Sequence, residues 1–414
     1  MNQKKKNKSF IKQLIIFLSV LGPGIISAAA GDDAGGIATY ATVGAELQYK
    51  MLWAIFLMTF SLVIVQEMAA RMGAVTGKGL SDLIREQFGV KSTFFAMLTL
   101  FIANIAVTAS EFAGIAASLE LLNISKYISI PIMAVIIWLL VIKGSYKIVE
   151  RVFIGFSILL LSYIVAGFMA KPDWGQVLHY TFTPTIEFNS RYLTLFVGTV
   201  GTTIAPWMQF YLQSSIVDKG ITIKNYSYER IDAILGAIIA DIIAFFIILS
   251  TASTLYPHGI TIESAKDAAL ALKPFAGDYA PLIFGLGLFG VSVMSAAILP
   301  LSTSYVICEA FGWESGVDND FEDAPVFYTL YTAMIIIGSC IVLFSSQLLV
   351  HIMLIAQVIN GVLVPVILIY MLKLINNQRL MGEHVNSPLY NVIVWITIVF
   401  IIILTVLMFV FMFR

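Results

Sequence analysis

Charged side chains are scarce in this 414-residue chain: Asp, Glu, Lys and Arg together make up only 12% of it. A soluble domain carries about 25% charged residues, because its surface faces water. Hydrophobic residues reach 59% of the chain, and the mean hydropathy is +0.92. This composition excludes a soluble globular protein, a disordered chain and a coiled coil, and it predicts an integral membrane protein.

Cysteine, histidine and net charge are also limited. Cys308 and Cys340 lie in or beside apolar runs without metal-ligand spacing, so we expect neither a disulfide framework nor a zinc site. The four histidines lie at or near predicted loops or span ends, and no two of them have metal-ligand spacing. A net charge of −1 gives no electrostatic reason to expect a nucleic-acid partner. We also expect no enzymatic activity, no cofactor and no obligate protein partner.

Long apolar runs are, by contrast, abundant. A helix that crosses a bilayer needs about 20 mostly apolar residues, and the chain contains eleven such segments. The first lacks a convincing small-residue cleavage site and continues through a glycine-rich stretch, so we do not expect a cleaved signal peptide. The predicted spans cover residues 14–48, 51–73, 93–122, 127–143, 145–170, 190–217, 229–255, 279–311, 325–345, 347–376 and 389–413.

The distribution of Lys and Arg predicts how these spans are oriented. With the N-terminus inside, 17 of the 24 Lys and Arg residues fall in cytoplasmic segments and seven fall outside. Because positive charges favour the cytoplasmic side, we expect a multi-pass protein of the cell (plasma) membrane with its N-terminus in the cytoplasm and its C-terminus outside. The predicted organisation is a single transmembrane domain, 1–414, made of a basic tail (1–13), a first repeat (14–170), a second repeat (190–376) and an extra helix (389–413).

Two of the spans contain residues that break helices. In the first span, glycines surround the adjacent carboxylates Asp32 and Asp33; in the sixth, Gly198, Gly201 and Pro206 interrupt the apolar run. Charged side chains in hydrocarbon are costly, and unwound backbone at membrane depth is tolerated only where it lines a cavity or is covered by protein. Interruptions at corresponding places in two halves predict a transporter built from inverted repeats.

Other interpretations of these breaks remain open. Ordinary glycine and proline kinks are frequent in membrane helices. A sodium-coupled small-solute symporter would use the same architecture, although paired aspartates attract a cation and repel a carboxylate substrate. An intramembrane protease needs two separated carboxylates, and Asp32 and Asp33 are adjacent in the chain. A channel is a further alternative, because an uncoupled transporter differs from a channel mainly in the rate at which ions pass.

Several segments of the chain resemble the Nramp family of divalent-metal transporters. The resemblance rests on the first-span motif, on 66–89 and 110–122, and on the sixth-span stretch GTTIAPWMQFYLQSS, and it extends over nearly all eleven spans. It implies an all-α integral membrane protein with eleven transmembrane helices and a LeuT-type inverted repeat of five plus five helices. In that fold, the metal ion binds between the unwound helices 1 and 6.

The sequence departs from the family pattern at several positions. The family signature Asp-Pro-Gly-Asn is here Asp33, Ala34, Gly35 and Gly36, and the family's sixth-span methionine is Ala205. The third-span aspartate tied to proton movement is replaced by a threonine, both sixth-span histidines are missing, and the ninth span has no arginine. This pattern resembles the Nramp-related magnesium transporter (NRMT) branch, which carries Mg²⁺ and Mn²⁺ without proton coupling. The alternative is a proton-coupled Mn²⁺/Fe²⁺ transporter of the Nramp type.

The resemblance implies a metal site in which a carboxylate supplies the charge. Carboxylate, carbonyl and water ligands suit Mg²⁺ and Mn²⁺, whereas sulfur favours softer metals. Loss of the methionine and asparagine ligands leaves room for a partly hydrated ion, because Mg²⁺ dehydrates reluctantly. We expect the ion to be bound at Asp33, Gly36, Ala30, Thr202, Ala205, Gln357 and, to a lesser degree, Asp32. Gln66, Glu67, Glu111 and Asp241 are candidates for lining the cavity or forming a gate.

Overall fold

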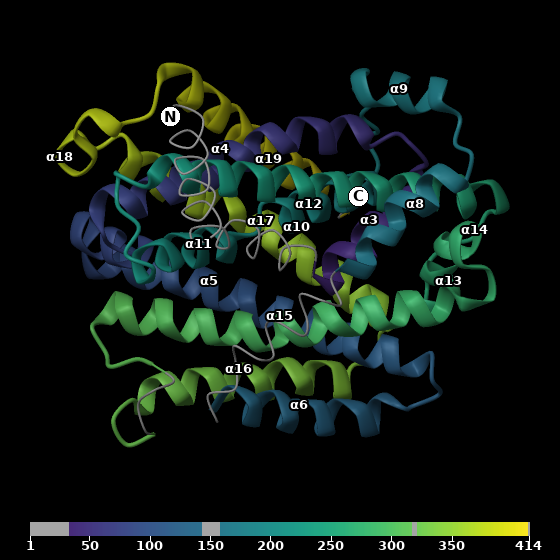
Figure 1. The fold of residues 1–414 in the computed structure, drawn as a ribbon, viewed down its shortest axis with the longest axis horizontal. Helices are drawn as coiled ribbons and strands as arrows, with labels where there is room; N and C mark the ends of the chain where they lie inside the picture. Colours follow the sequence, from purple (N-terminus) through teal and green to yellow (C-terminus); the bar gives the residue numbers. More distant parts are fainter. Residues whose placement is uncertain (1–32, 143–157, 317–320, 413–414) are drawn as a thin grey trace, which may run out of the picture.

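The structure of the chain, a computed structural model, describes residues 33–142, 158–316 and 321–412. Within these residues every regular element is a helix, and the long helices lie side by side (Figure 1). The elements are α3 (Ala34–Leu47), α4 (Leu52–Thr76), α5 (Leu80–Glu120), α6 (Lys126–Ile142), η1 (Ile158–Leu161), α8 (Ser162–Met169), α9 (Trp174–Phe182), α10 (Ser190–Thr203), α11 (Pro206–Asp218), α12 (Tyr226–Thr254), η2 (Tyr256–His258), α13 (Ala265–Ala269), η3 (Leu270–Leu272), α14 (Lys273–Ala276), η4 (Gly277–Tyr279), α15 (Ala280–Phe311), α16 (Pro325–Phe344), α17 (Leu349–Ile375), α18 (Gln378–Met381), η5 (Gly382–His384) and α19 (Pro388–Met412).

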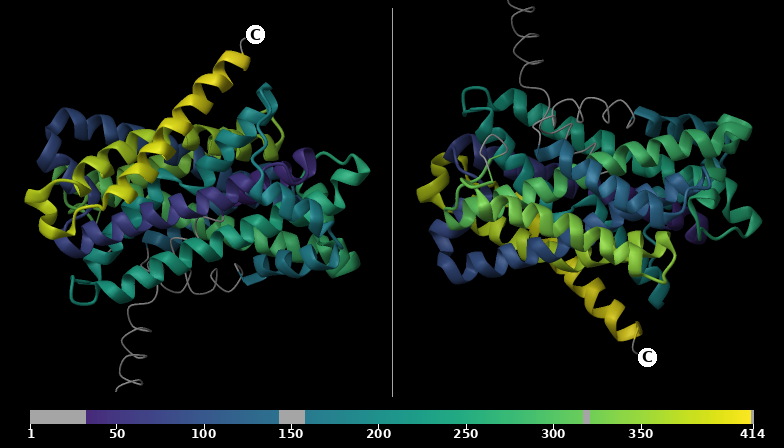
Figure 2. Two further views of the ribbon diagram at one scale, coloured as in Figure 1. Left: turned by 90° about the horizontal axis from the view of Figure 1, so that it is seen from above. Right: turned by 90° about the horizontal axis from the view of Figure 1, so that it is seen from below.

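Each of the eleven predicted spans contains at least one of these helices. Seven helical segments of the described chain are long and apolar enough to cross a membrane, and α6 is a shorter apolar helix. The first span is represented by α3 alone, because its earlier residues lie outside the described part of the chain. Figure 2 shows α19 extending away from the rest of the bundle at its C-terminal end, which agrees with its low burial.

The predicted break in the sixth span is present between α10 and α11. Asn189 caps the start of α10, its side chain accepting a hydrogen bond from Tyr192 N. The helix ends at Thr203, and Ala205 has an extended backbone (φ −61°, ψ 136°). Pro206 is the first residue of α11, where its missing N–H is not needed by the helix. Helix 6 is therefore unwound at mid-span, as the sequence predicts.

Close contact between α10 and α17 depends on two glycines. A Cβ atom added at Gly201 would lie 1.9 Å from the carbonyl oxygen of Gln357, and one at Gly361 would lie 2.1 Å from the carbonyl oxygen of Val197. No larger side chain fits at either position without displacing backbone. Small residues that let backbones approach are typical of helix packing in membranes. This contact holds α17 against the end of α10, next to the break.

Ion pairs join α3 to the start of α10 at one end of the bundle. Arg191 forms two hydrogen bonds to the Glu46 carboxylate, at 2.8 and 2.5 Å, and Lys50 Nζ lies 2.6 Å from Glu187 Oε1. Trp53 Nε1 donates to the carbonyl of the nearby Thr185 at 3.1 Å. We call the pairs Glu46–Arg191 and Lys50–Glu187 the ionic link. They tie the first half of the chain to the second.

Candidate metal-ion site

Asp33 stands at the N-terminus of α3, where it caps the helix. Its Oδ1 atom accepts a hydrogen bond from the backbone N–H of Gly36 at 2.6 Å, and the residue is 2% exposed. The glycines on either side give α3 weak intrinsic helix propensity, so the cap defines where this helix begins. A carboxylate at a helix N-terminus is also stabilised by the helix dipole. Asp33 is therefore held in a fixed position inside the bundle.

Gln357 of α17 reaches Asp33 across the bundle. Its Nε2 atom donates to both carboxylate oxygens of Asp33, at 2.9 and 3.2 Å. Asn360 Nδ2 donates to Gln357 Oε1 at 3.1 Å, which fixes the orientation of the glutamine amide. Both amides are completely buried. The structure thus brings together two predicted site residues that are 324 positions apart, and it adds Asn360, which the sequence analysis missed.

The same glutamine places the helix break at the level of Asp33. Its backbone carbonyl lies against Gly201, while its side chain reaches the Asp33 carboxylate. Thr202, in the last turn of α10, is buried, and its Oγ1 atom has no hydrogen-bond partner. The last carbonyl groups of a helix also lack intrahelical partners. Ala205 follows in the break and is 2% exposed, with no side-chain polar atom. Gln357 therefore connects Asp33 to the end of α10, where Thr202 and Ala205 lie; that these residues bind an ion stays a prediction.

Glu111 of α5 lies beside this region. Its Oε2 atom accepts a hydrogen bond from the backbone N–H of Ala34 at 3.3 Å, and its Oε1 atom has no partner. The neighbouring Ser110 approaches Gly35, where an added Cβ atom would lie 2.8 Å from the serine Oγ. Glu111 is thus a second buried carboxylate next to the start of α3. Its position agrees with both predicted roles, a gate and a structural carboxylate.

Glu67 belongs to a separate ionic cluster. Its carboxylate lies 3.2 Å from Arg71 one turn along α4, and Tyr226 of α12 donates a short hydrogen bond to it. Arg230 is 4.0 Å away. Arg71 in turn donates to the backbone carbonyl of His384 at 3.1 Å. These contacts favour the interpretation of Glu67 as part of an ion-pair gate that connects α4, α12 and the segment before α19.

Asp241 lies in a groove between α4 and α12, away from the contacts of Asp33. The groove encloses about 270 Å³ and is otherwise almost entirely apolar, with Thr59 of α4 as its other polar side chain. Asp241 is 4% exposed, and its Oδ2 atom has no hydrogen-bond partner. No described hydrogen bond connects Asp241 to Asp33 or Gln357. Its predicted place near the ion path therefore has no contact to support it.

Two predicted ligands, Ala30 and Asp32, lie outside the described residues. Gly36 contributes its backbone N–H to Asp33. Gln66 is buried on α4 and its Oε1 atom has no partner. Among the residues that the structure describes, no three His, Cys, Asp or Glu side chains converge as a metal cluster. The region around Asp33 therefore offers two buried carboxylates, Asp33 and Glu111, together with amide, hydroxyl and backbone groups.

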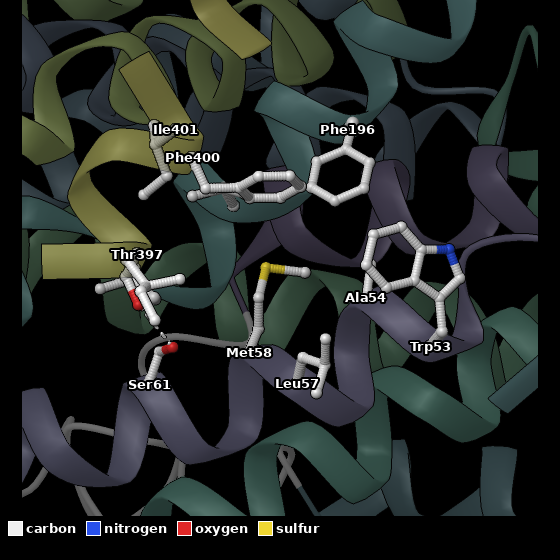
Figure 3. Close-up of a pocket in the computed structure, with 12 residues that line it drawn as sticks. Trp53, Ala54, Leu57, Met58, Ser61, Phe196, Thr397, Phe400 and Ile401 are labelled. Carbon is white, nitrogen blue, oxygen red and sulfur yellow. Dashed lines mark hydrogen bonds between the residues drawn. The ribbon is translucent and has the colours of Figure 1, made fainter. Parts of the chain in front are cut away.

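A larger cavity of about 280 Å³ lies between α4, α10 and α19 (Figure 3). Trp53, Met58, Phe196 and Phe400 line it, and the only side-chain hydrogen bond drawn there joins two hydroxyl groups, Ser61 Oγ and Thr397 Oγ1, at 2.8 Å. Its walls are mostly apolar and carry no carboxylate. Neither Asp33 nor Gln357 lines this cavity.

Comparisons with known proteins identify the family. Residues 24–411 match the family model Nramp, described as natural resistance-associated macrophage protein-like. The divalent metal cation transporter MntH of Caldanaerobacter subterraneus is 27% identical over 402 residues, covering 94% of this chain and 92% of that protein. MntH of Bacillus subtilis is 26% identical over 420 residues, covering 96% and 93%.

Solved structures show the same fold. The manganese transporter of Eremococcus coleocola aligns with a TM-score of 0.78 at 20% identity, covering 95% of this chain and 86% of that one. Mhp1, a nucleobase-cation-symport-1 family transporter, aligns with a TM-score of 0.58 at 14% identity, covering 94% and 90%. These likenesses confirm the predicted all-α membrane fold of LeuT type. With a family match over nearly its whole length, the chain belongs to the Nramp family.

Proposed function

We propose that this chain transports divalent metal cations across the cell membrane, with Mg²⁺ as its principal ion and Mn²⁺ as a second. Membership of the Nramp family supports the coarser part of this proposal, and so do the relatives named divalent metal cation transporters. The feature on which it depends is the buried carboxylate Asp33 at the start of α3, joined by Gln357 to the end of the interrupted helix α10. A fixed negative charge at mid-span attracts a cation and disfavours the sodium-coupled symporter of an anionic solute.

The preference for Mg²⁺ is inferred from the ligands that surround Asp33. The break in helix 6 presents Ala205, which has no sulfur atom, and the neighbouring described groups are the amide of Gln357, the hydroxyl of Thr202 and backbone carbonyls. Oxygen ligands suit Mg²⁺ and Mn²⁺; Gln357 would have to turn its Oε1 atom from Asn360 toward the ion to supply one. A glycine at position 36 and an alanine at 205 leave room for water, which Mg²⁺ tends to retain. Ala30 and Asp32 complete the proposed ligand set.

The absence of proton coupling is likewise a proposal. Thr108 stands where proton-coupled relatives carry an aspartate, and its hydroxyl donates to the Asn104 carbonyl at 2.7 Å within α5. Glu111 favours the alternative, a proton-coupled Mn²⁺/Fe²⁺ transporter, because it is a buried carboxylate bonded to the residue after Asp33. We place the N-terminus in the cytoplasm and divide the fold into repeats 14–170 and 190–376, followed by the extra helix.

Uptake into proteoliposomes tests the proposed function. Purified protein is reconstituted, and entry of Mg²⁺, Mn²⁺, Ca²⁺ and Co²⁺ is compared side by side at equal concentration. We expect Mg²⁺ entry above that of empty vesicles, competed by Mn²⁺. Exclusion of Mg²⁺ together with fast Mn²⁺ entry would contradict the proposed preference and would favour manganese transport, as named for the Eremococcus coleocola protein.

A further inference from the structure

Helix α11 carries a buried amide that the proposed ion site does not use. Gln209 is only 1% exposed, and neither its Oε1 nor its Nε2 atom has a hydrogen-bond partner. Leucine would fill about the same volume without leaving two polar atoms unpaired, and unpaired buried polar groups cost free energy. Buried polar side chains without partners are rare in folded proteins. Gln209 therefore points to a ligand supplied from outside the described protein.

The helical register places Gln209 on the same face as the break. It lies four residues after Ala205, and residues four apart share one face of a helix. Gln213 continues the row by one more turn, where its Nε2 atom donates to the carbonyl of Lys78 at 2.9 Å. A Cβ atom added at Gly73 of α4 would lie 3.0 Å from the backbone oxygen of Gln213. This face of α11 is therefore turned toward α4.

Gln66 of α4 is a second buried amide, and its oxygen has no partner. Helix α4 runs parallel to the interrupted helix formed by α10 and α11. Trp53 of α4 contacts Phe196 of α10 near one end (ring centroids 5.6 Å apart), and Gly73 of α4 contacts Gln213 of α11 near the other. Gln66 precedes Gly73 by two helical turns on the same face, which brings it to the level of the break. It is 3% exposed.

We propose that Gln209, together with Gln66, binds the water shell of the transported cation one turn beyond Asp33. This inference rests on the proposed function and deepens it. Amide oxygens accept hydrogen bonds from metal-bound water, so the two side chains hold a hydrated ion through its water molecules without adding charge. Asp33 supplies the attraction, and the neutral amides recognise a cation that keeps its waters. The chemical class of ligand is a hydrated divalent cation, with Mg²⁺ as the best example.

Cobalt(III) hexaammine is the probe that tests this inference. Its six ammine ligands do not exchange, so the complex cannot bind directly to a carboxylate or carbonyl and is held only through N–H donors. A site built to hold a hydrated ion should accept it, and the complex should therefore inhibit Mn²⁺ uptake by the wild-type protein. Failure of the complex to inhibit the wild type overturns the inference.

The Gln209→Leu variant removes both amide atoms while keeping the side-chain volume. We expect its unfolding temperature to be unchanged or raised and its Mn²⁺ uptake to be reduced but not abolished, because Asp33 still attracts the ion. Inhibition by cobalt hexaammine should weaken by about tenfold, which corresponds to one lost hydrogen-bonding group. The Gln209→Glu variant keeps an acceptor oxygen and adds charge, so it should strengthen inhibition; it also keeps the test available if the leucine variant does not fold.

Gln213→Leu is the matched control: this amide lies on the same face, and its Nε2 atom already donates to a backbone carbonyl, so only its Oε1 atom lacks a partner. It should leave inhibition by cobalt hexaammine within about twofold of wild type. Unchanged inhibition in Gln209→Leu, or an equal loss in Gln213→Leu, overturns the assignment of Gln209. The proposed function fails separately, if the wild type carries no divalent cation or if its uptake does not depend on Asp33.

Discussion

Asp33 is held by two hydrogen-bond donors, one from its own helix and one from a distant part of the chain. Gly36 N fixes it from its own helix, and Gln357 Nε2 fixes it from α17. These donors lower the energetic cost of burying a carboxylate, but they do not neutralise its charge. Two donors therefore orient the carboxylate, and a divalent cation is the partner that its ionised form favours.

Removal of this charge should stop transport. We expect Asp33→Ala to reduce uptake of Mg²⁺ and Mn²⁺ to the level of empty vesicles while the protein remains folded, as judged by size-exclusion chromatography and thermal unfolding. Asp32→Ala should have a milder effect. Asp241→Asn is the comparison that separates charge from position, since it removes another buried carboxylate without touching Asp33. Near-normal uptake by Asp33→Ala would contradict the assignment.

Selectivity should follow the identity of the ligands around the ion. We expect the double variant Ala205→Met and Gly36→Asn to shift the preference toward Mn²⁺, because it introduces a soft sulfur ligand and an amide and narrows the space for water. The measurement is competition of Mg²⁺ against Mn²⁺ uptake, which should weaken by about tenfold for a loss of one ligand contact. Equal competition in variant and wild type would show that ligand identity does not set selectivity here.

The contact between α10 and α17 positions the site at the scale of helices. Gly201 allows the backbone of Gln357 to approach, and this approach in turn sets how far the glutamine side chain reaches. The positions of the Asp33 carboxylate, the Gln357 amide and the helix break relative to one another therefore depend on the small size of Gly201. Any side chain at this position has to push the two helices apart.

Gly201→Ala should therefore separate α10 from α17 and impair transport. We expect a loss of about 1–3 kcal/mol in stability from overpacking, together with reduced uptake because Gln357 is displaced from Asp33. Thermal unfolding in detergent and uptake in proteoliposomes measure the two effects. The matched control is Gly198→Ala on the same helix, where the added Cβ meets its nearest neighbour only at 3.4 Å. If both variants behave alike, the close approach has no functional role.

At the scale of the whole molecule, the membrane potential can drive transport of a divalent cation without a coupled ion. Each charge that crosses gains about 2.3 kcal/mol per 100 mV, so a divalent ion gains roughly 4.6 kcal/mol. This energy supports a concentration ratio above about a thousandfold, since about 1.4 kcal/mol corresponds to tenfold. We expect an inside-negative potential to accelerate Mg²⁺ entry without acidifying the vesicle interior, as reported by a trapped pH dye. Proton influx in proportion to metal influx would instead indicate coupling through Glu111.

Local features of the sequence predicted the break in helix 6, which Pro206 and Gly201 indicate directly. The cap that Asp33 forms on α3 was not predicted. Contacts between residues far apart in the chain could not be predicted in this way, because no local sequence pattern indicates them. The partner of Glu67 on α12, Tyr226, is 159 positions away. Helix α12 is apolar on nearly all sides, so periodicity could not tell whether Asp241 faces the site or the groove against α4.

The ionic link between α3 and α10 has a consequence for how salt affects the transporter. Lys50, Glu187 and Arg191 are partly exposed to solvent, and ion pairs of this kind contribute only about 0–1 kcal/mol each. Hydrogen bonding from Lys50 lowers the pKa of Glu187, so its contribution is lost only as pH falls below the usual range of glutamate. Acidity in the physiological range therefore leaves the link intact. Added salt does not, because the Debye length shrinks from about 10 Å at 0.1 M to about 3 Å at 1 M. At high salt, the two halves of the chain should therefore separate more readily where the ionic link joins them. We expect the rate of this separation to rise with ionic strength.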